Sequence, residues 1–212
     1  QRSHAVPGRI VGIDMALGTP QLMALEVHVQ PLKRWQIGLG YVFLFLLGWT
    51  RARWQLAAAL GILLAYWAWF AIHPPPPGLD TTTLGVPADW AHHYGGFAAH
   101  WNKNTNAASA FDQWFLNLFP REKPFVFSRG GYATLNFIPS LATMIFGLLA
   151  GNILRRTETS GAQRLMTLIL SGLACLAAGY ALDRTGICPS VKRIWTPAWA
   201  LLSSGWTFLM LA

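Results

Sequence analysis

The sequence predicts an all-α protein, a polytopic transmembrane helical bundle with about five spans. Two observations concern the whole chain: 53% of its 212 residues are hydrophobic and only 11% are charged, and its mean hydropathy is +0.35. The third is local, because the stretch 131–154 contains no charged residue and is followed directly by Arg155 and Arg156. A helix that rises about 1.5 Å per residue over this stretch can cross a hydrocarbon core of about 30 Å.

The charges are distributed as expected for loops between membrane spans. The formal net charge is +8, but the 16 Lys and Arg occur in ones and twos between apolar runs. This distribution favours charges that set membrane topology and does not indicate nucleic-acid binding. The 11 Trp fit belts at the membrane interfaces. We therefore expect membrane lipid as a partner and no nucleic acid, and the sequence leaves oligomer formation open.

The first two segments are expected to differ in character. Segment 1–34 is predicted to be irregular or non-native, because Pro and Gly interrupt any helical period. Segment 35–72 is predicted to be a transmembrane helical hairpin, with one span over 35–49 and a second over 54–72. The chain has no initiator Met and stops inside an apolar run, so we expect an internal fragment of a longer protein.

Segment 73–131 is predicted to be a long extracytoplasmic loop. It begins with four consecutive prolines, which end the preceding helix. A loop of this length usually carries structure or function of its own. Apolar residues recur from Phe111 to Phe119 at i, i+3, i+4, i+7 and i+8, which predicts an amphipathic helix that ends at Pro120. This helix is expected either to lie flat at the membrane interface or to cover the bundle as a lid.

Segment 132–212 is predicted to form three transmembrane helices with short loops. The first is the charge-free stretch, the second covers 165–182, and the third starts near Ile194. Basic residues are denser in the loops 50–53 and 155–164 than in the opposite short loops. This difference places these two loops in the cytoplasm and the long loop outside.

Small residues are expected where these helices touch. Gly172 and Gly179 in the second helix suit a close approach of two backbones. Gly147 and Gly151 form a small-xxx-small pair in the charge-free stretch, and we interpret them as a packing face too.

Three histidines of the long loop, His92, His93 and His100, are the first candidates for chemistry. They lack the spacing of a zinc-protease motif and no cysteine accompanies them, so the sequence predicts no metal site. A single histidine can still act as a general base. No nucleophile–base pair, carboxylate pair or phosphate-binding loop can be assembled from the sequence.

The run 99–106 is dense in hydrogen-bonding groups and aromatic rings. Sugar-binding surfaces use such groups, because apolar sugar faces stack on aromatic rings while hydroxyls need fixed polar partners. The alternative interpretation is an ordinary polar loop. The substrate-binding candidates in this run are His100, Trp101, Asn102 and Lys103.

Asn136 is the remaining substrate-binding candidate and lies near the outer end of the charge-free stretch. Burial of an unpaired amide costs about 1–3 kcal/mol, so we expect a hydrogen-bond partner. The residue either makes an interhelical hydrogen bond that only holds the bundle together or lines a cavity that positions a substrate. Pro139 is expected to free a backbone carbonyl one turn back, beside Asn136.

Four stretches, in this order, are similar to those of one known family. Gln36-Ile-Gly-Leu-Gly-Tyr41 resembles the span before its outer loop, and His100-Trp-Asn-Lys-Asn104 with 111–120 resembles the bacterial form of that loop. The stretch 131–151 is similar to the signature span, and 186–197 resembles the next outer loop. On these motifs, residues 36–212 resemble a bacterial member of the heparan-alpha-glucosaminide N-acetyltransferase family.

The resemblance implies a membrane enzyme that takes an acetyl group from acetyl-CoA in the cytoplasm and delivers it to the amino group of a terminal glucosamine on the other side. It implies acetyl-CoA as co-substrate, an amino sugar as acceptor and a bacterial inner membrane as location. The family's catalytic histidine belongs to a His-x-x-Trp-x-Gly segment that this sequence lacks. The catalytic residue therefore stays unknown, and the fragment alone is expected to be inactive. The alternative is a multi-pass transporter or a non-catalytic membrane protein that handles an amino sugar.

Overall fold

The structure is a computed structural model that describes residues 38, 40–76, 78 and 80–212. The predicted segment 1–34 and the first residues of the first predicted span lie outside the described residues. Within the described part, the secondary structure is helical and contains no strand.

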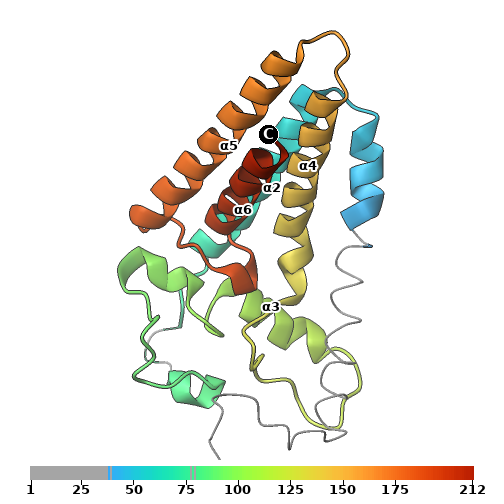
Figure 1. Cartoon of the computed structure of the whole chain (residues 1–212). Coiled ribbons are helices and arrows are strands. Elements are labelled where there is room, and N and C mark those ends of the chain that lie inside the picture. The colour runs from blue at the N-terminus through green and yellow to red at the C-terminus, as the bar shows by residue number, and fades with distance from the viewer. Residues whose placement is uncertain (1–37, 39, 77, 79) are drawn as a thin grey trace, which may run out of the picture. The chain divides into compact units, whose positions relative to one another are not determined.

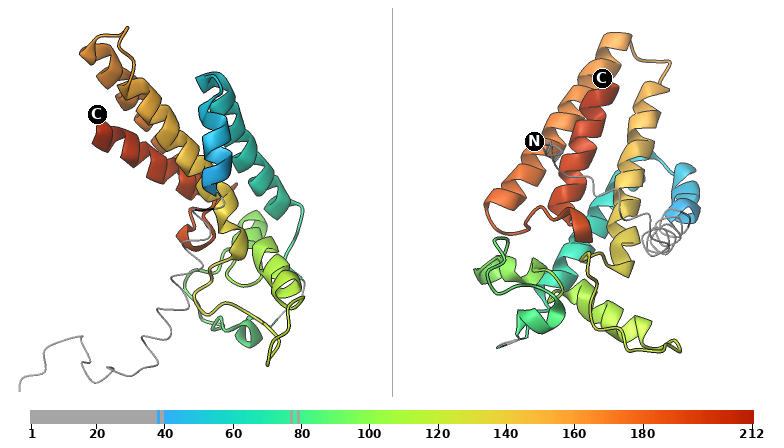
Figure 2. Two further views of the ribbon diagram at one scale, coloured as in Figure 1. Left: turned by 90° about the vertical axis from the view of Figure 1, so that its right-hand side faces the viewer. Right: turned by 60° about the horizontal axis from the view of Figure 1, so that its bottom comes forward.

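The first described helix covers residues 40–48. It is followed by α2 (Ala52–Ala71), the 3-10 helices η1 (Thr81–Leu84) and η2 (Gly96–Trp101), α3 (Ala107–Leu116), η3 (Thr134–Asn136), α4 (Phe137–Leu154), α5 (Gly161–Arg184), η4 (Lys192–Ile194) and α6 (Pro197–Leu211). Helices α2, α4, α5 and α6 form a bundle, and the segment between α2 and α4 lies at one end of it (Figures 1 and 2).

Three helical stretches are long and apolar enough to cross a membrane: Ala52–Ala71, Thr134–Leu154 and Gly161–Arg184. Large apolar side chains such as Leu64 and Leu170 point outward from them, as expected where lipid surrounds the protein. The structure is therefore that of a helical membrane protein. Within the described residues, the helical stretch 40–48 and the 15-residue α6 are not among these three.

Glycines bring α5 and α6 into close contact. A Cβ atom added to Gly172 would lie 3.0 Å from the backbone oxygen of Gly205, and one added to Gly179 would lie 2.9 Å from the backbone oxygen of Ala198. Only glycine allows the two backbones to approach so closely. The prediction that Gly172 and Gly179 serve a helix contact is confirmed.

The corresponding prediction for Gly147 and Gly151 is wrong. A Cβ atom added at either position would meet no atom within 4 Å in the described residues. Gly147 lines a small cavity between α4 and α6, where the two helices meet through larger side chains such as Phe146 and Phe208, whose rings lie 6.5 Å apart. The spacing of two small residues thus did not reveal which face of α4 is covered.

A buried amide connects the helix over 40–48 to α2 and α4. Gln55 is only 1% exposed, and its Nε2 donates hydrogen bonds to the backbone oxygens of Leu47 and Thr50, each at 3.0 Å. Its Oε1 accepts a hydrogen bond from Asn152 Nδ2 at 2.8 Å. Because every polar atom of the Gln55 side chain has a partner, this contact fixes the three segments to each other.

Helix α4 begins at Phe137, later than the charge-free stretch indicated, and η3 precedes it. Pro139 is consequently the third residue of α4, within the first turn, where a backbone N–H has no acceptor in the helix. The proline therefore removes no hydrogen bond from α4. The carbonyl one turn back, which Pro139 was expected to free, thus lies in η3, before α4 begins.

Helix α3 is the predicted amphipathic helix with different limits. It starts after Asn106, whose side-chain Oδ1 accepts a hydrogen bond from the backbone N–H of Ser109 at 3.0 Å. It ends at Leu116, before Pro120. The next residue, Asn117, pairs with the following loop, because its Oδ1 accepts a hydrogen bond from the backbone N–H of Phe125 at 2.7 Å.

Candidate functional site

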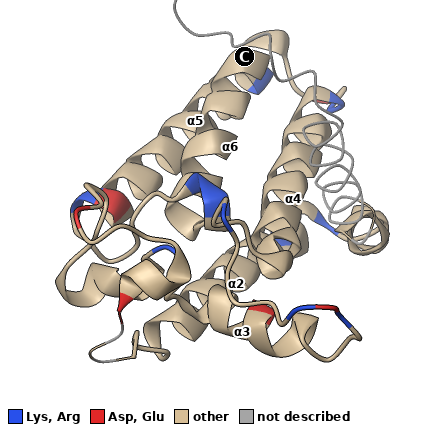
Figure 3. Ribbon diagram, turned by 90° about the horizontal axis from the view of Figure 1, so that it is seen from below, with Lys and Arg blue, Asp and Glu red and all other residues tan. Residues whose placement is uncertain are grey.

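A hollow of about 310 Å³ lies where the segment after α2 meets the loop between α5 and α6. We call it the loop-side hollow. Its lining residues come from three parts of the chain: Trp90, His92, Tyr94, Trp101, Lys103 and Asn106; Gly131; and 190–194. Figure 3 views this end of the molecule and shows Lys and Arg near the middle of the face, close to the start of α6.

Trp101 provides an aromatic wall with an unused donor. Trp101 is the last residue of η2 and is 1% exposed. Its ring stacks on that of Phe70 of α2, with ring centroids 6.1 Å apart and an angle of 9° between the planes. The ring of Phe97 packs against the Trp101 ring, with ring centroids 5.4 Å apart. Its Nε1–H is buried and has no hydrogen-bond partner. A buried donor without a partner carries an energetic penalty that a ligand oxygen would relieve.

Two positive side chains converge at Gly131, which adopts a φ of 70°. A Cβ atom there would lie 3.2 Å from Lys103 Cγ and 3.6 Å from Arg193 Cδ. The Lys103 ammonium lies 5.1 Å from the centre of the Trp90 ring, an attractive arrangement of a cation over an aromatic face. Burial and then the charge of Arg193 lower the pKa of Lys103 below its ordinary value.

The residues that line the loop-side hollow include no carboxylate. Asp183 is close to its rim: Asp183 Oδ1 accepts a hydrogen bond from the backbone N–H of Ser190 at 2.6 Å. Burial raises the pKa of Tyr94, and the charge of Asp183 raises it further. With Lys103, Lys192 and Arg193 in its walls, the hollow is electropositive.

Asn136 supports the wall of the loop-side hollow from behind. It is 4% exposed, and its Nδ2 donates a hydrogen bond to the backbone oxygen of Arg193 at 2.6 Å. This is the partner that burial of the amide required. Its Oδ1 is also buried and has no partner. Asn136 therefore positions Arg193 and keeps one acceptor unused.

Two more side chains from the bundle hold the same wall. Tyr66 of α2 donates a hydrogen bond through its hydroxyl to the backbone oxygen of Ile194 at 3.1 Å. Trp195 donates through Nε1 to Thr143 Oγ1 of α4 at 3.0 Å. Contacts from α2, η3 and α4 thus fix three consecutive residues, 193–195.

The structure separates the residues that the sequence placed together. Trp101 and Lys103 line the loop-side hollow, whereas His100 and Asn102 do not. His100 Nδ1 lies 2.7 Å from the backbone oxygen of Phe97. Asn102 accepts a hydrogen bond from the backbone N–H of Tyr94 at 2.8 Å and donates one to its backbone oxygen at 3.0 Å, so it holds Tyr94 in place.

Sequence reasoning missed Trp90, Tyr94, Lys192 and Arg193 as site residues. The available signal was the second outer loop, 186–197, whose basic pair follows a proline. Nothing in the spacing showed that this loop folds against residues about 90 positions earlier in the sequence. Among the described residues, no three His, Cys, Asp or Glu side chains gather in a way that could hold a metal ion.

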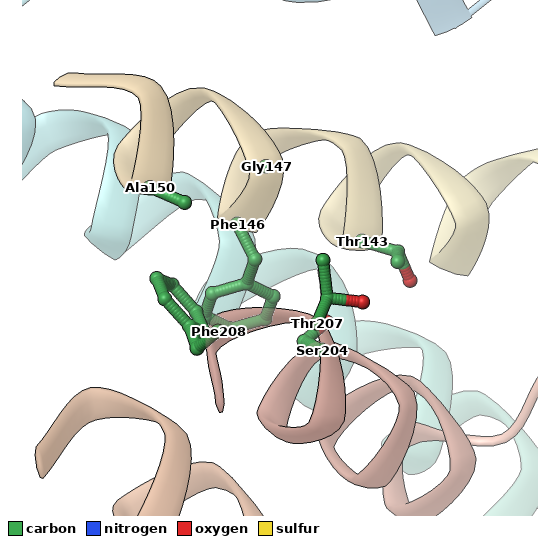
Figure 4. A pocket seen from close by; sticks show the side chains of 7 residues that line it. All are labelled: Thr143, Phe146, Gly147, Ala150, Ser204, Thr207 and Phe208. Carbon is green, nitrogen blue, oxygen red and sulfur yellow. The ribbon is translucent and has the colours of Figure 1, made fainter. Parts of the chain in front are cut away.

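A second, smaller cavity of about 50 Å³ lies between α4 and α6. Figure 4 shows Thr143, Gly147 and Ala150 of α4 opposite Ser204 and Thr207 of α6. Ser204 is 2% exposed and its hydroxyl has no partner. The cavity is too small for a sugar.

No family model matches the chain, and the comparisons with curated proteins and with solved structures found no match.

Proposed function

We propose that the chain is part of a multi-pass bacterial inner-membrane acyltransferase that moves an acetyl group from acetyl-CoA to the amino group of a glucosamine-type sugar. The sequence resemblance motivates the reaction. The observation that carries the proposal is the loop-side hollow, which combines aromatic walls, an unused Trp101 donor and fixed cations at one end of the bundle. In this proposal the hollow is the acceptor site, and the amino sugar binds there.

The lining chemistry suits a sugar. The apolar face of a sugar ring can stack on an indole ring such as Trp90, while hydroxyl oxygens accept hydrogen bonds from Trp101 Nε1 and from Lys103. Asn136 does not line the hollow, but its hydrogen bond holds the backbone of Arg193 in the wall, so in this proposal it positions that wall from behind. Its buried hydrogen bond serves the site and the bundle together.

The positive charges favour the reactive form of the acceptor. A sugar amine attacks the thioester carbon only as the neutral amine. Its nitrogen forms the N–C bond while the C–S bond breaks and CoA leaves as its thiolate, so in this proposal the thioester end of acetyl-CoA reaches the hollow from the cytoplasmic side of the bundle. Lys103 and Arg193 disfavour an ammonium group beside them, since like charges repel. Bound amine is therefore held more in its neutral form than amine in water.

His92 is the candidate group to take up the proton that the amine loses. It lines the loop-side hollow, and its ring lies 5.5 Å from the ring of Trp90. An imidazole can accept a proton from a nucleophile within hydrogen-bond reach. Nε2 of the neighbouring His93 lies 3.3 Å from the backbone oxygen of Pro87, and His93 does not line the hollow.

Transfer across a bilayer tests the proposal. The full-length protein is reconstituted in liposomes that enclose glucosamine, and acetyl-CoA labelled in its acetyl group is added outside. The expected product is labelled N-acetylglucosamine inside the liposomes. Movement of unmodified glucosamine without acetylation would instead identify a transporter and overturn the acyltransferase.

Variants of the neighbouring histidines and of Lys103 test the assigned roles. His92→Gln is expected to lose most of the transfer rate, whereas His93→Gln keeps it as the matched control. Lys103→Gln removes a cation from the hollow, so the pKa of the bound amine rises and the increase of transfer rate with pH moves to higher pH. Equal rates of the two histidine variants would remove His92 from the mechanism and leave the reaction itself intact.

A further inference from the structure

Helix α3 has one side that is fixed to the rest of the protein. Asp112 is 4% exposed, and its two carboxylate oxygens accept hydrogen bonds from the backbone N–H of Thr134 at 3.1 and 3.0 Å. Gln113 Nε2 donates to the backbone oxygen of Val126 at 2.8 Å, and Asn117 Nδ2 donates to that of Phe125 at 2.9 Å. These contacts determine which way the opposite side of α3 faces.

That opposite side carries the rings of Phe111, Trp114 and Phe115, and Phe119 continues the set just after the helix; we call these four rings the α3 aromatic row. Phe111 lies 5.6 Å from Trp114 and 5.4 Å from Phe115, and Phe115 lies 5.3 Å from Phe119. Trp114 is 61% exposed and Phe119 55% exposed, and Leu118 beside them is 58% exposed. Contiguous apolar side chains with this exposure mark a surface that meets another apolar phase.

The α3 aromatic row begins where a membrane-crossing helix ends. Trp69 lies in the last turn of α2, and its ring centre is 6.4 Å from that of Phe111, with the planes at 84°. Trp residues at the ends of membrane helices sit at the level of the lipid headgroups. Because Trp69 touches Phe111 directly, the row continues outward from α2 at that depth.

We propose that the α3 aromatic row lies in the interfacial region of the bilayer and is covered by phospholipid. Indole and phenyl rings suit this region because it offers apolar acyl chains on one side and polar headgroups on the other. A lid over the bundle, the other placement that the sequence allowed, would bury these rings against the helices. The exposure of Trp114 and Phe119, beside the half-buried Phe111 and Phe115, favours the interface.

Charge next to the row agrees with lipid as the partner. Arg121 and Lys123 follow Pro120, a few residues after α3, and are exposed; the equally exposed Glu122 between them leaves the three residues with a net charge of +1. The Arg121 guanidinium lies 5.5 Å from the centre of the Phe125 ring, which holds it beside the row. Basic side chains at this position face headgroup phosphates, an attraction of about 1 kcal/mol per residue near an anionic surface.

The α3 aromatic row, held in the bilayer interface, would affect the proposed acceptor site through one contact. Asp112 binds Thr134, the first residue of η3, and η3 ends with Asn136 behind the loop-side hollow. If the bilayer fixes the depth of α3 relative to the membrane, it therefore also fixes the depth of Asn136. The inference does not depend on acyl transfer, since it concerns only where α3 lies.

Depth-sensitive labels on α3 test the proposal. A fluorescent NBD group is attached to Trp114→Cys, Leu118→Cys or Thr83→Cys in a Cys175→Ala background, because Cys188 is fully buried. Thr83 is the control, since it is exposed in η1 and lies outside α3. The whole chain is placed in nanodiscs of phosphatidylcholine and phosphatidylglycerol, with and without brominated acyl chains.

The labels at 114 and 118 are expected to emit at shorter wavelength and to lose fluorescence in brominated discs, whereas the label at 83 does neither. Equal behaviour at all three positions would overturn the proposal. Short-wavelength emission at 114 and 118 without quenching by bromine would also overturn it, because protein rather than lipid would then cover the row.

Charge reversal provides a second measurement that leaves the rings in place. Arg121→Glu combined with Lys123→Glu is expected to reduce the quenching at 114 in discs that contain phosphatidylglycerol, and less so in pure phosphatidylcholine. Retained helicity, measured by circular dichroism, shows that the variant is folded. An unchanged quenching in both lipids would contradict the role of the two basic residues.

Discussion

Replacing Gly179 by Ala tests how closely α5 and α6 approach. The added Cβ atom would lie 2.8 Å from Leu202 Cγ, 2.9 Å from the backbone oxygen of Ala198 and 3.0 Å from the backbone nitrogen of Leu202. The leucine can rotate but the backbone cannot, so the helices must move apart. Overpacking of this kind costs about 1–3 kcal/mol, and the higher helix propensity of Ala returns up to about 1 kcal/mol. We expect a net loss of stability of up to about 2 kcal/mol.

Gly147→Ala is the matched control, because a Cβ atom at Gly147 meets no atom within 4 Å in the described residues. The helix-propensity term is similar in both variants, so the difference between them isolates the packing cost, about 1–3 kcal/mol. The assay is reversible unfolding in mixed micelles with increasing denaturing detergent, followed by circular dichroism. A Gly179→Ala protein as stable as Gly147→Ala would refute the close contact.

Three further predictions concern the loop side. Asn136→Ala removes the hydrogen bond to Arg193 and is expected to lower the free energy of unfolding by about 1 kcal/mol. The variant is expected to fold but to lose the proposed acetyl transfer. If it instead fails to fold, the role of Asn136 is purely structural. Burial holds the pKa of Asp112 above its usual 3.8, so the stability that it contributes is complete below 3.8 and falls as the pH rises through the raised pKa. Asp112→Asn should flatten this part of the curve of unfolding free energy against pH, and an unchanged slope would contradict the assignment. Burial raises the pKa of Cys188 to about 12, so maleimide at neutral pH should label it only after unfolding, and rapid labelling of the folded protein would show that the loop opens.

The membrane-crossing helices could be predicted because their signal is local. An uninterrupted apolar stretch such as 131–154 needs no knowledge of its neighbours, and the structure has a crossing helix over Thr134–Leu154. The limits of the helix depended on more distant contacts. Asn136 pairs with the backbone of Arg193, and this partner lies 57 residues away in the sequence, where no helical period could reveal it.

The same distinction explains the glycines. A small-xxx-small spacing states that a helix can approach another helix closely, but the neighbour decides which glycine is used. Gly179 meets the backbone of α6, whereas Gly147 meets nothing within 4 Å in the described residues. Gly147 satisfies the sequence rule through Gly151, whereas Gly179 has Cys175 and Asp183 four positions away, and the placement of α6 decides which of the two is in close contact.

The sequence predicted only some of the residues that line the candidate site. Trp101 and Lys103 were found because aromatic and polar residues cluster along one short run. Arg193 was missed because it reaches the loop-side hollow from a loop that follows α5. A site assembled from two loops is visible in the sequence only as two separate polar segments, and composition alone does not pair them.

Trp195 indicates that the second of these loops is held in a form it would not adopt alone. Its φ of 51° is left-handed, a region that bulky residues rarely occupy and that costs about 1–3 kcal/mol. The indole bond to Thr143 compensates for part of this cost, and the hydroxyl of Thr196 accepts a hydrogen bond from the backbone N–H of Val191 at 3.0 Å to close the turn. Backbone strain persists where surrounding contacts over-determine it. Here those contacts lie directly beside Arg193, so the bundle maintains the strained loop in the position where its cation completes the loop-side hollow.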